Sequence, residues 1–289
     1  MNYPRTRHPR LVAISRSPAY SPLQHEANDS AILDATVREL EALGWSARRV
    51  TEHAVAAGSL PDADLYLNMC QGPAASQVLV AHEAMGVRFF NRPSSVLACH
   101  RHRLVPALRG SGLAFPATVL LRTDEPLGAA ERADLRLLGG GPLWLKRGGV
   151  HAERPEDVVV LDSVAELPRG LAEFAARGIG LAAVQVHVPG PVVKFYAVAD
   201  GTLFHAYLAH SGAPVTSADV DIPALRALAF RAAGRLQLDI FGGDVIIDPD
   251  RRPVLIDLND WPSFAPIRDW AARAIAGHVH AARPRGVLA

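Results

Sequence analysis

The order of short apolar runs and longer amphipathic stretches constrains the fold of this chain more than any other feature. In the first third, apolar runs at 11–15, 65–68 and 87–90 alternate with stretches at 31–43 and 74–85 whose apolar residues recur at helical spacing. Strands that alternate with helices predict a small open parallel sheet. The first part of the chain is therefore expected to be a parallel α/β domain.

Polar residues follow two of these strands directly. In an open parallel sheet the binding edge lies at the carboxyl ends of the strands. We therefore expect the residues at those ends to contact the substrate. They are Ser15, Arg16, Asn68 and Gln71.

The middle of the chain has the pattern of a small α+β lobe. Ser94 or Ser95 can cap a helix that runs to about Arg109, and a strand is expected near Val119. The sequence LWLKRGG at 143–149 predicts a strand that ends in a flexible, glycine-bearing loop.

The last third is dominated by strands without intervening helices. Apolar strand patterns occupy 182–188, 192–199 and 202–209, and the dipeptide Asp200-Gly201 indicates a tight hairpin. A helix from Asp221 precedes two further strands, and a final helix is expected near 265–282. We expect an α/β protein with three units: an N-terminal parallel domain at 1–93, a middle lobe at 94–184 and a C-terminal antiparallel lobe at 185–289.

Composition excludes several classes of protein. The 30 Lys and Arg residues balance 29 Asp and Glu residues, so a net charge of +1 offers no footprint for nucleic acid or an anionic membrane. Two cysteines cannot build a disulfide framework, and no apolar run approaches the roughly 18 residues of a membrane span. We expect a soluble, cytoplasmic protein that acts on a small molecule and binds neither nucleic acid nor membrane.

Three oxygen-bearing side chains occur on two neighbouring strand patterns of the last third. Asp257 and Asn259 are two residues apart, so a strand would present both on one face, and Asp244 can meet them from the paired strand. Two carboxylates and an amide oxygen suit Mg²⁺. Ordinary aspartates at solvated strand ends would give the same pattern, although unpaired carboxylates are costly in such apolar strands.

Three cations are candidates for contacts with phosphate. Lys146 and Lys194 lie in strand patterns, where a lysine is either an outer-face residue or a point charge aimed at an anion. Arg103 could act similarly from its helix. The sequence contains no GxxxxGK[ST], GxGxxG, GxSxG or HExxH motif, which argues against the corresponding nucleotide-loop, dinucleotide, esterase and zinc-protease classes.

Three segments of the chain, in the order in which they occur, resemble parts of the ATP-grasp superfamily. The stretch 91–118 resembles the entry to its middle lobe, LWLKRGG the strand with the nucleotide-binding lysine, and FGGDVIIDPDRRPVLIDLNDWPSF at 241–264 its metal-binding hairpin. The resemblance implies ATP and one or two Mg²⁺ ions as cofactors.

The resemblance also implies roles for individual residues. Asp244, Asp257 and Asn259 would bind the metal, and Arg103 and Lys146 would contact the ATP phosphates. The segment Gln185, Val186, His187 and Val188 resembles the hinge that pairs with adenine. Lys194 and His151 would face the γ-phosphate and the second substrate.

Two branches of the superfamily fit the sequence. Most members resemble ligases that join a carboxylate to an amine through an acyl phosphate, whereas a smaller branch resembles inositol polyphosphate kinases. Asp257 stands where ligases usually have Glu, and Lys194 where they often have Arg, which favours the kinase branch. The sparse cations of the N-terminal loops favour a small-molecule ligase, which is our leading hypothesis. A kinase acting on a polyol hydroxyl, a non-catalytic ATP-binding module and a homodimer remain open.

Overall fold

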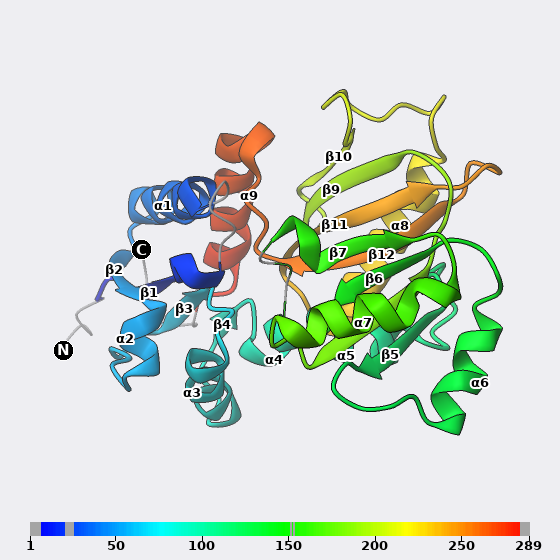
Figure 1. The fold of residues 1–289 in the computed structure, drawn as a ribbon. Helices are drawn as coiled ribbons and strands as arrows, with labels where there is room; N and C mark the ends of the chain where they lie inside the picture. Colours follow the sequence, from blue (N-terminus) through cyan, green and yellow to red (C-terminus); the bar gives the residue numbers. More distant parts are fainter. Residues whose placement is uncertain (1–6, 21–25, 151, 153, 284–289) are drawn as a thin grey trace, which may run out of the picture.

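The computed structural model describes residues 7–20, 26–150, 152 and 154–283, and its architecture is α/β with three four-stranded sheets (Figure 1). The first sheet is wholly parallel, as the alternating pattern predicts. Its strand order is β2 (Ser46–Thr51), β1 (Arg10–Ser15), β3 (Leu65–Asn68) and β4 (Phe89–Phe90). The helices of this domain are α1 (Glu26–Ala42), α2 (Glu52–Ala56) and α3 (Pro73–Ala84).

The second sheet forms the middle lobe and is antiparallel throughout. Its order is β5 (Thr118–Arg122), β8 (Leu181–Val186), β6 (Leu143–Arg147) and β7 (Val158–Leu161). The helices α6 (Ala129–Leu137) and α7 (Leu167–Ala176) belong to this lobe. Leucines of both helices share a buried cluster with the sheet, which gives the lobe a core of its own.

The third sheet is also antiparallel, in the order β10 (Phe204–Leu208), β9 (Val192–Val198), β11 (Ile240–Ile247) and β12 (Pro253–Asp260). The apolar face of α8 (Ile222–Leu236) packs against it. Asp221 caps this helix by accepting a hydrogen bond from the amide of Ala224 at 3.1 Å. The hairpin β11–β12 turns at Arg251, whose φ of +62° is left-handed.

The expected helix from Ser94 to Arg109 is two helices. They are α4 (Pro93–Ala98) and α5 (Arg101–Leu108). His100 between them is extended, with φ −65° and ψ 134°, which ends the first helix and redirects the second. The helix α6 was not predicted, because a polar, glycine-rich stretch follows it closely in sequence.

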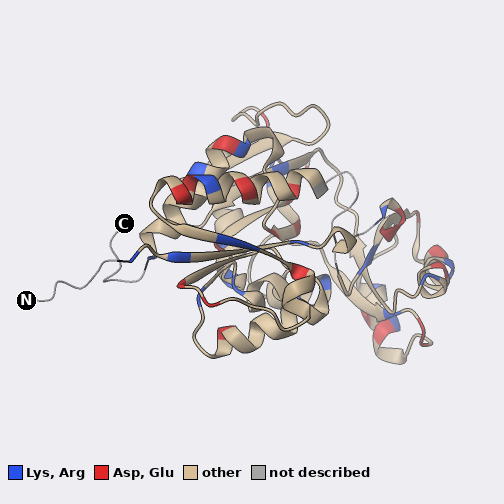
Figure 2. Ribbon diagram, turned by 90° about the vertical axis from the view of Figure 1, so that its left-hand side faces the viewer, with Lys and Arg blue, Asp and Glu red and all other residues tan. Residues whose placement is uncertain are grey.

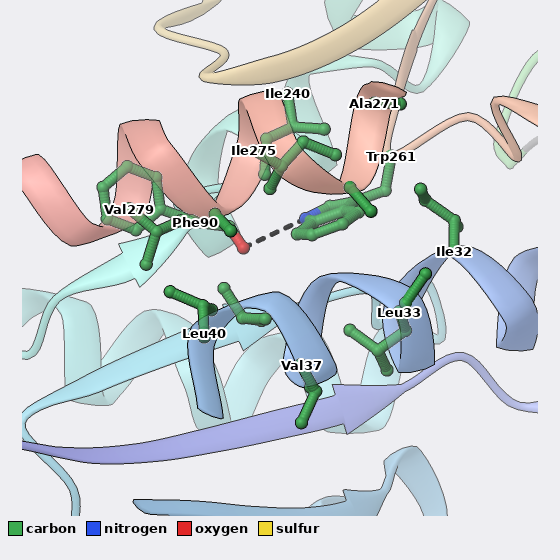
Figure 3. Close-up of a cluster of buried hydrophobic side chains, with 14 of the residues drawn as sticks. Ile32, Leu33, Val37, Leu40, Phe90, Ile240, Trp261, Ala271, Ile275 and Val279 are labelled. Carbon is green, nitrogen blue, oxygen red and sulfur yellow. Dashed lines mark hydrogen bonds between the residues drawn. The ribbon is translucent and has the colours of Figure 1, made fainter. Parts of the chain in front are cut away.

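The last helix, α9 (Arg268–Ala281), returns to the N-terminal domain and packs beside α1 (Figure 1). Figure 3 shows its apolar face meeting that of α1, with Trp261 between the two helices. The indole of Trp261 is fully buried and donates to the carbonyl of Phe90 at 3.0 Å. The unit at 185–289 therefore contributes its last helix to the core of the first domain.

Charged residues are interspersed along the ribbon rather than segregated by sign (Figure 2), as the near-zero net charge suggests. Within the described residues, no helix combines the length and apolar character that a bilayer span requires.

Asn91 joins the first domain to the third sheet through three hydrogen bonds. The side chain is fully buried; its Oδ1 accepts from the amides of Asp239 and Ile240 at 2.7 and 2.8 Å, and its Nδ2 donates to the carbonyl of Ile240 at 2.6 Å. Because β11 begins at Ile240, this one side chain fixes where the strand enters the sheet.

We predict that Asn91→Ala lowers the free energy of unfolding by about 2–4 kcal/mol, because it leaves buried backbone groups without partners. Chemical denaturation followed by circular dichroism measures the change. The matched control is Asn259→Ala, where the amide is only partly buried and the expected change is below about 1 kcal/mol. Equal losses in the two variants would contradict the role assigned to Asn91.

Candidate active site

A row of chemically active side chains crosses the third sheet from one edge to the other. In the strand register, Tyr207 of β10 lies beside Lys194 of β9, Lys194 beside Asp244 of β11, and Asp244 beside Asp257 of β12. Asn259 is two residues beyond Asp257 on the same strand, so both side chains leave the same face. The strand pairing thus brings together the three proposed metal ligands and Lys194.

A cleft of about 350 Å³ between the third sheet and the N-terminal domain is lined by four of these residues, Lys194, Asp244, Asp257 and Asn259. The N-terminal domain contributes side chains from the loop after β1, from α1 and from the loop after β3. The lining comprises Arg16, Tyr20, Asp29, Gln71, Arg101, Ala152, Lys194, Tyr196, Gly243, Asp244, Asp257, Asn259, Asp260, Trp261, Pro262 and Ser263.

A pair of glycines in β11 allows the three strands to approach at this point. A Cβ on Gly243 would lie 2.5 Å from the carbonyl oxygen of Asp257 and 2.8 Å from the ring of Phe195. A Cβ on Gly242 would lie 2.7 Å from the carbonyl oxygen of Phe195. No side chain fits in either place, so the pair immediately before Asp244 sets the close spacing of the acidic row.

Both carboxylates of the row form ion pairs. Lys194 Nζ lies 3.0 Å from Asp244 Oδ1, and Arg101 Nη2 lies 2.6 Å from Asp257 Oδ2. Burial raises the pKa of Asp244, and the nearby ammonium of Lys194 opposes part of that shift. Burial alone would lower the pKa of Lys194, but the charge and hydrogen bond of Asp244 outweigh it and raise the pKa.

Arg101, rather than Arg103, is the arginine of α5 that enters the cleft. Arg103 is exposed, and its Nε lies 3.4 Å from a ring nitrogen of the neighbouring His102. Arg101 was missed at the sequence level, although a signal was present: it lies on the helix face of Leu104, Val105 and Leu108, spaced as i, i+3, i+4 and i+7. An arginine on an apolar helix face needs a buried partner, and here that partner is Asp257.

Lys146 lies on β6 of the middle sheet and is buried. Its Nζ donates to Gln185 Oε1 at 2.6 Å, and Gln185 Nε2 donates in turn to the hydroxyl of Thr118 at 3.1 Å. Burial lowers the pKa of Lys146 to about 8, although the carboxylate of Asp257 acts in the opposite direction. The predicted nucleotide lysine and the first residue of the predicted hinge are thus in contact.

The remainder of the predicted hinge continues from β8. The amide of Val186 donates to the carbonyl of Ala117 and the amide of His187 to the carbonyl of Pro142, both at 3.0 Å. The indole of Trp144 lies 3.0 Å from His187 Nδ1. Pairing of adenine with this segment, which ends at Val188, therefore has to use other backbone atoms, and it remains a prediction.

The predicted substrate residues of the N-terminal domain divide into two pairs. Arg16 and Gln71 line the cleft, whereas Ser15 and Asn68 do not belong to its lining. Asn68 is buried and bonded to backbone, donating to the carbonyl of Asn91 at 3.3 Å and accepting from the amide of Cys70 at 3.0 Å. Ser15 donates to the carbonyl of Val50 at 3.4 Å. His151 lies outside the described residues.

The guanidinium of Arg16 is held on several sides by the protein. It donates to Asp29 at 2.8 Å and to the carbonyls of Met69 and Trp261 at 3.3 Å each, and it lies 3.9 Å from Asp260. Gln71 Nε2 also donates to Asp260, at 3.1 Å. Arg16 therefore ties the N-terminal domain to the end of β12, and Asp29 and Asp260 are cleft residues that the sequence did not reveal.

The donor set suits a hard divalent cation. Asp244, Asp257 and Asn259 present carboxylate and amide oxygens within one cleft, and burial disfavours the charged form of Asp244, which a bound cation would relieve. Among the described residues, no group of three His, Cys, Asp or Glu side chains is arranged to hold a metal ion. A metal at this site would therefore need the amide oxygen of Asn259 as its third protein donor.

Comparison with solved structures identifies the class of fold. The D-alanine–D-alanine ligase of Bacillus anthracis, solved with ATP, matches at a TM-score of 0.67 and 13% identity, covering 95% of this chain and 99% of that one. A RimK-domain ATP-grasp protein of Sphaerobacter thermophilus matches at 0.66 and 20% identity, covering 94% and 99%. The D-alanyl-alanine synthetase A of Vibrio cholerae matches at 0.68 and 10% identity, covering 93% of each chain.

The chain has the ATP-grasp fold. At these identities the likeness establishes the fold alone. No protein-family model and no curated protein sequence matches the chain significantly.

The contacts of Arg16 predict a structural role in joining the domains. We expect Arg16→Met to lower the free energy of unfolding by about 3 kcal/mol, because it removes the cation from buried carboxylates. Arg49→Met is the matched control: Arg49 pairs with Asp34 at 2.8 Å on the surface, and its loss should cost less than about 1 kcal/mol. Unchanged thermal and chemical stability of the Arg16 variant would show that this residue serves ligands rather than the fold.

Proposed function

We propose that this protein is an ATP- and Mg²⁺-dependent ligase that joins a small carboxylate to an amine. The observation that carries the proposal is the row of Lys194, Asp244 and Asp257, which faces the N-terminal loops across one cleft in an ATP-grasp fold. The solved neighbours named as ligases support the reaction class. The proposed ligands are thus ATP, a small carboxylate and a small amine.

Cations from two sheets are proposed to hold the nucleotide. Lys146 of the middle sheet would contact the phosphates, with Gln185 beside it and adenine along the segment that ends at Val188. Arg101 takes the role first assigned to Arg103, because its guanidinium lines the cleft. Lys194 is half-exposed in the cleft, with 44% of its side chain accessible, and this access supports the proposal that it contacts the transferred phosphoryl group.

Asp244, Asp257 and Asn259 would hold Mg²⁺. When bound, the metal supplies electrostatic stabilisation of the phosphates during transfer. The contribution of the chain is to present oxygens at a fixed spacing, which the strand register and the glycine pair of β11 provide. Preorganised charges of this kind reduce the reorganisation that the reaction requires.

The proposed chemistry has two steps. A carboxylate oxygen of the first substrate attacks the γ-phosphorus of ATP, so that the bond to ADP breaks and an acyl phosphate forms. The amine of the second substrate then attacks the acyl carbon, and a carbon–nitrogen bond forms as phosphate leaves and the amine loses a proton. Lys194 would stabilise the negative charge of the phosphoryl group in both steps.

We expect ADP release to require an acid and an amine together. A screen of paired carboxylates and amines, with polyols as a separate arm and mass analysis of products, measures it. Free phosphate and a product lacking phosphate support the ligase. Phosphate retained on a hydroxyl acceptor would contradict the ligase proposal and favour the kinase. Nucleotide binding without turnover in any arm would indicate a non-catalytic module.

Asp257→Asn should reduce turnover by at least about a hundredfold in the productive arm of that screen, because the negative charge of a carboxylate ligand is lost and a neutral amide replaces it. The matched control is Asp250→Asn, an exposed acid in the turn of the same hairpin, which should retain activity. Circular dichroism of both variants establishes that the fold is intact. Loss of activity in the Asp250 variant as well would remove the basis for assigning the site to Asp257.

The low pKa of Lys146 predicts a pH dependence of nucleotide binding. The side chain is cationic below pH 8 and loses its proton as the pH rises, whereas a bound phosphate favours the protonated form. The affinity for a non-hydrolysable ATP analogue should therefore fall by up to about tenfold per pH unit above pH 8. Calorimetric titration at several pH values measures this affinity. Lys146→Met should bind the analogue more weakly, with an affinity that does not change with pH. A pH-independent affinity in the unmodified protein would contradict the role assigned to Lys146.

A further inference from the structure

The two carboxylates proposed to bind the metal are each neutralised by a cation from another element. Arg101 of α5 pairs with Asp257 at 2.6 Å, and Lys194 of β9 pairs with Asp244 at 3.0 Å. The two pairs differ in their access to solvent. The Lys194 side chain is 44% exposed, whereas that of Arg101 is only 10% exposed, so the pair with Arg101 is the better shielded from water.

Arg101 also links two sheets. Its Nη1 donates to the carbonyl of Arg147 at 3.0 Å, at the end of β6 in the middle sheet, while Nη2 binds Asp257 in β12 of the third sheet. Its Nε is buried and has no hydrogen-bond partner among the described residues. The guanidinium therefore bridges the end of β6 and Asp257 of the acidic row, and its Nε remains without a partner among the described residues.

This arrangement opposes binding of a metal ion by itself. An oxygen that accepts a short, charge-assisted hydrogen bond from arginine is a poor ligand for a second cation. A divalent ion at Asp257 would also face the buried positive charge of Arg101 in a weakly screened site. The ion pair can open at low cost only when an anion arrives to receive the guanidinium.

We infer that Arg101 acts as an exchangeable counter-ion that excludes free divalent metal from the site until a polyphosphate enters. The triphosphate of a nucleotide supplies the anion that draws Arg101 away from Asp257, and the metal then occupies the vacated oxygen. Metal and nucleotide consequently bind as one unit. The inference rests on the proposed nucleotide and metal site, but not on ligase chemistry.

The test is a titration of the full chain with Mn²⁺ alone, without nucleotide, followed by electron paramagnetic resonance. We expect weak binding by the unmodified protein and a gain of about tenfold or more in Arg101→Met, the size of one charged hydrogen bond. Arg103→Met, on the exposed face of the same helix, is the matched control and should bind as weakly as the unmodified protein. Arg101→Gln, a smaller and still polar change, tests the same point if the Met variant does not fold.

Two further outcomes decide the matter. Adding Asp257→Asn to the Arg101→Met variant should abolish the gain, which locates the new affinity at β12. The inference is overturned if the unmodified protein binds Mn²⁺ as tightly as the Arg101 variants do. Because the readout needs no acid, amine or turnover, it can succeed even if the ligase proposal fails.

Discussion

The register of β9, β11 and β12 is the constraint on which the rest of the site depends. It places one lysine and two aspartates in a single row across three strands, and a shift of one residue would turn Asp244 to the opposite face of the sheet. Gly242 and Gly243 permit this spacing, and Asn91 fixes the start of β11. The site is thus specified by backbone pairing before any ligand contributes.

The carboxylates of this row are neutralised by nearby cations of the protein. Each carboxylate has a cation within hydrogen-bonding distance, and the neighbouring Arg16 is likewise enclosed by Asp29, Asp260 and backbone carbonyls. The near-zero net charge of the whole chain is reproduced on the scale of the cleft. The charged side chains of the cleft are paired with one another. Any ligand that binds to one of them has to compete with its partner in an ion pair.

Much of this fold could be predicted from the sequence, because hydrophobic periodicity reports strands and helices directly. The parallel first sheet, the hairpin of β11 and β12 and the meeting of Asp244 with Asp257 were all expected. The break at His100 and the partners of Arg16 were not, since they depend on contacts between residues far apart in sequence. Arg101 was partly predictable. The helical spacing shows that it lies on an apolar face, whereas its acidic partner, 156 residues away, could not be predicted from the sequence.

The position of α9 has a consequence for how the chain acquires its structure. The core around α1 is completed by Ile275 and Val279, more than two hundred residues after the first strand. Contacts between segments so distant carry a large loop-closure cost and slow folding. During synthesis, one side of α1 therefore stays uncovered until α9 has been made, and the core of the N-terminal domain is completed only after the two antiparallel sheets have been synthesised.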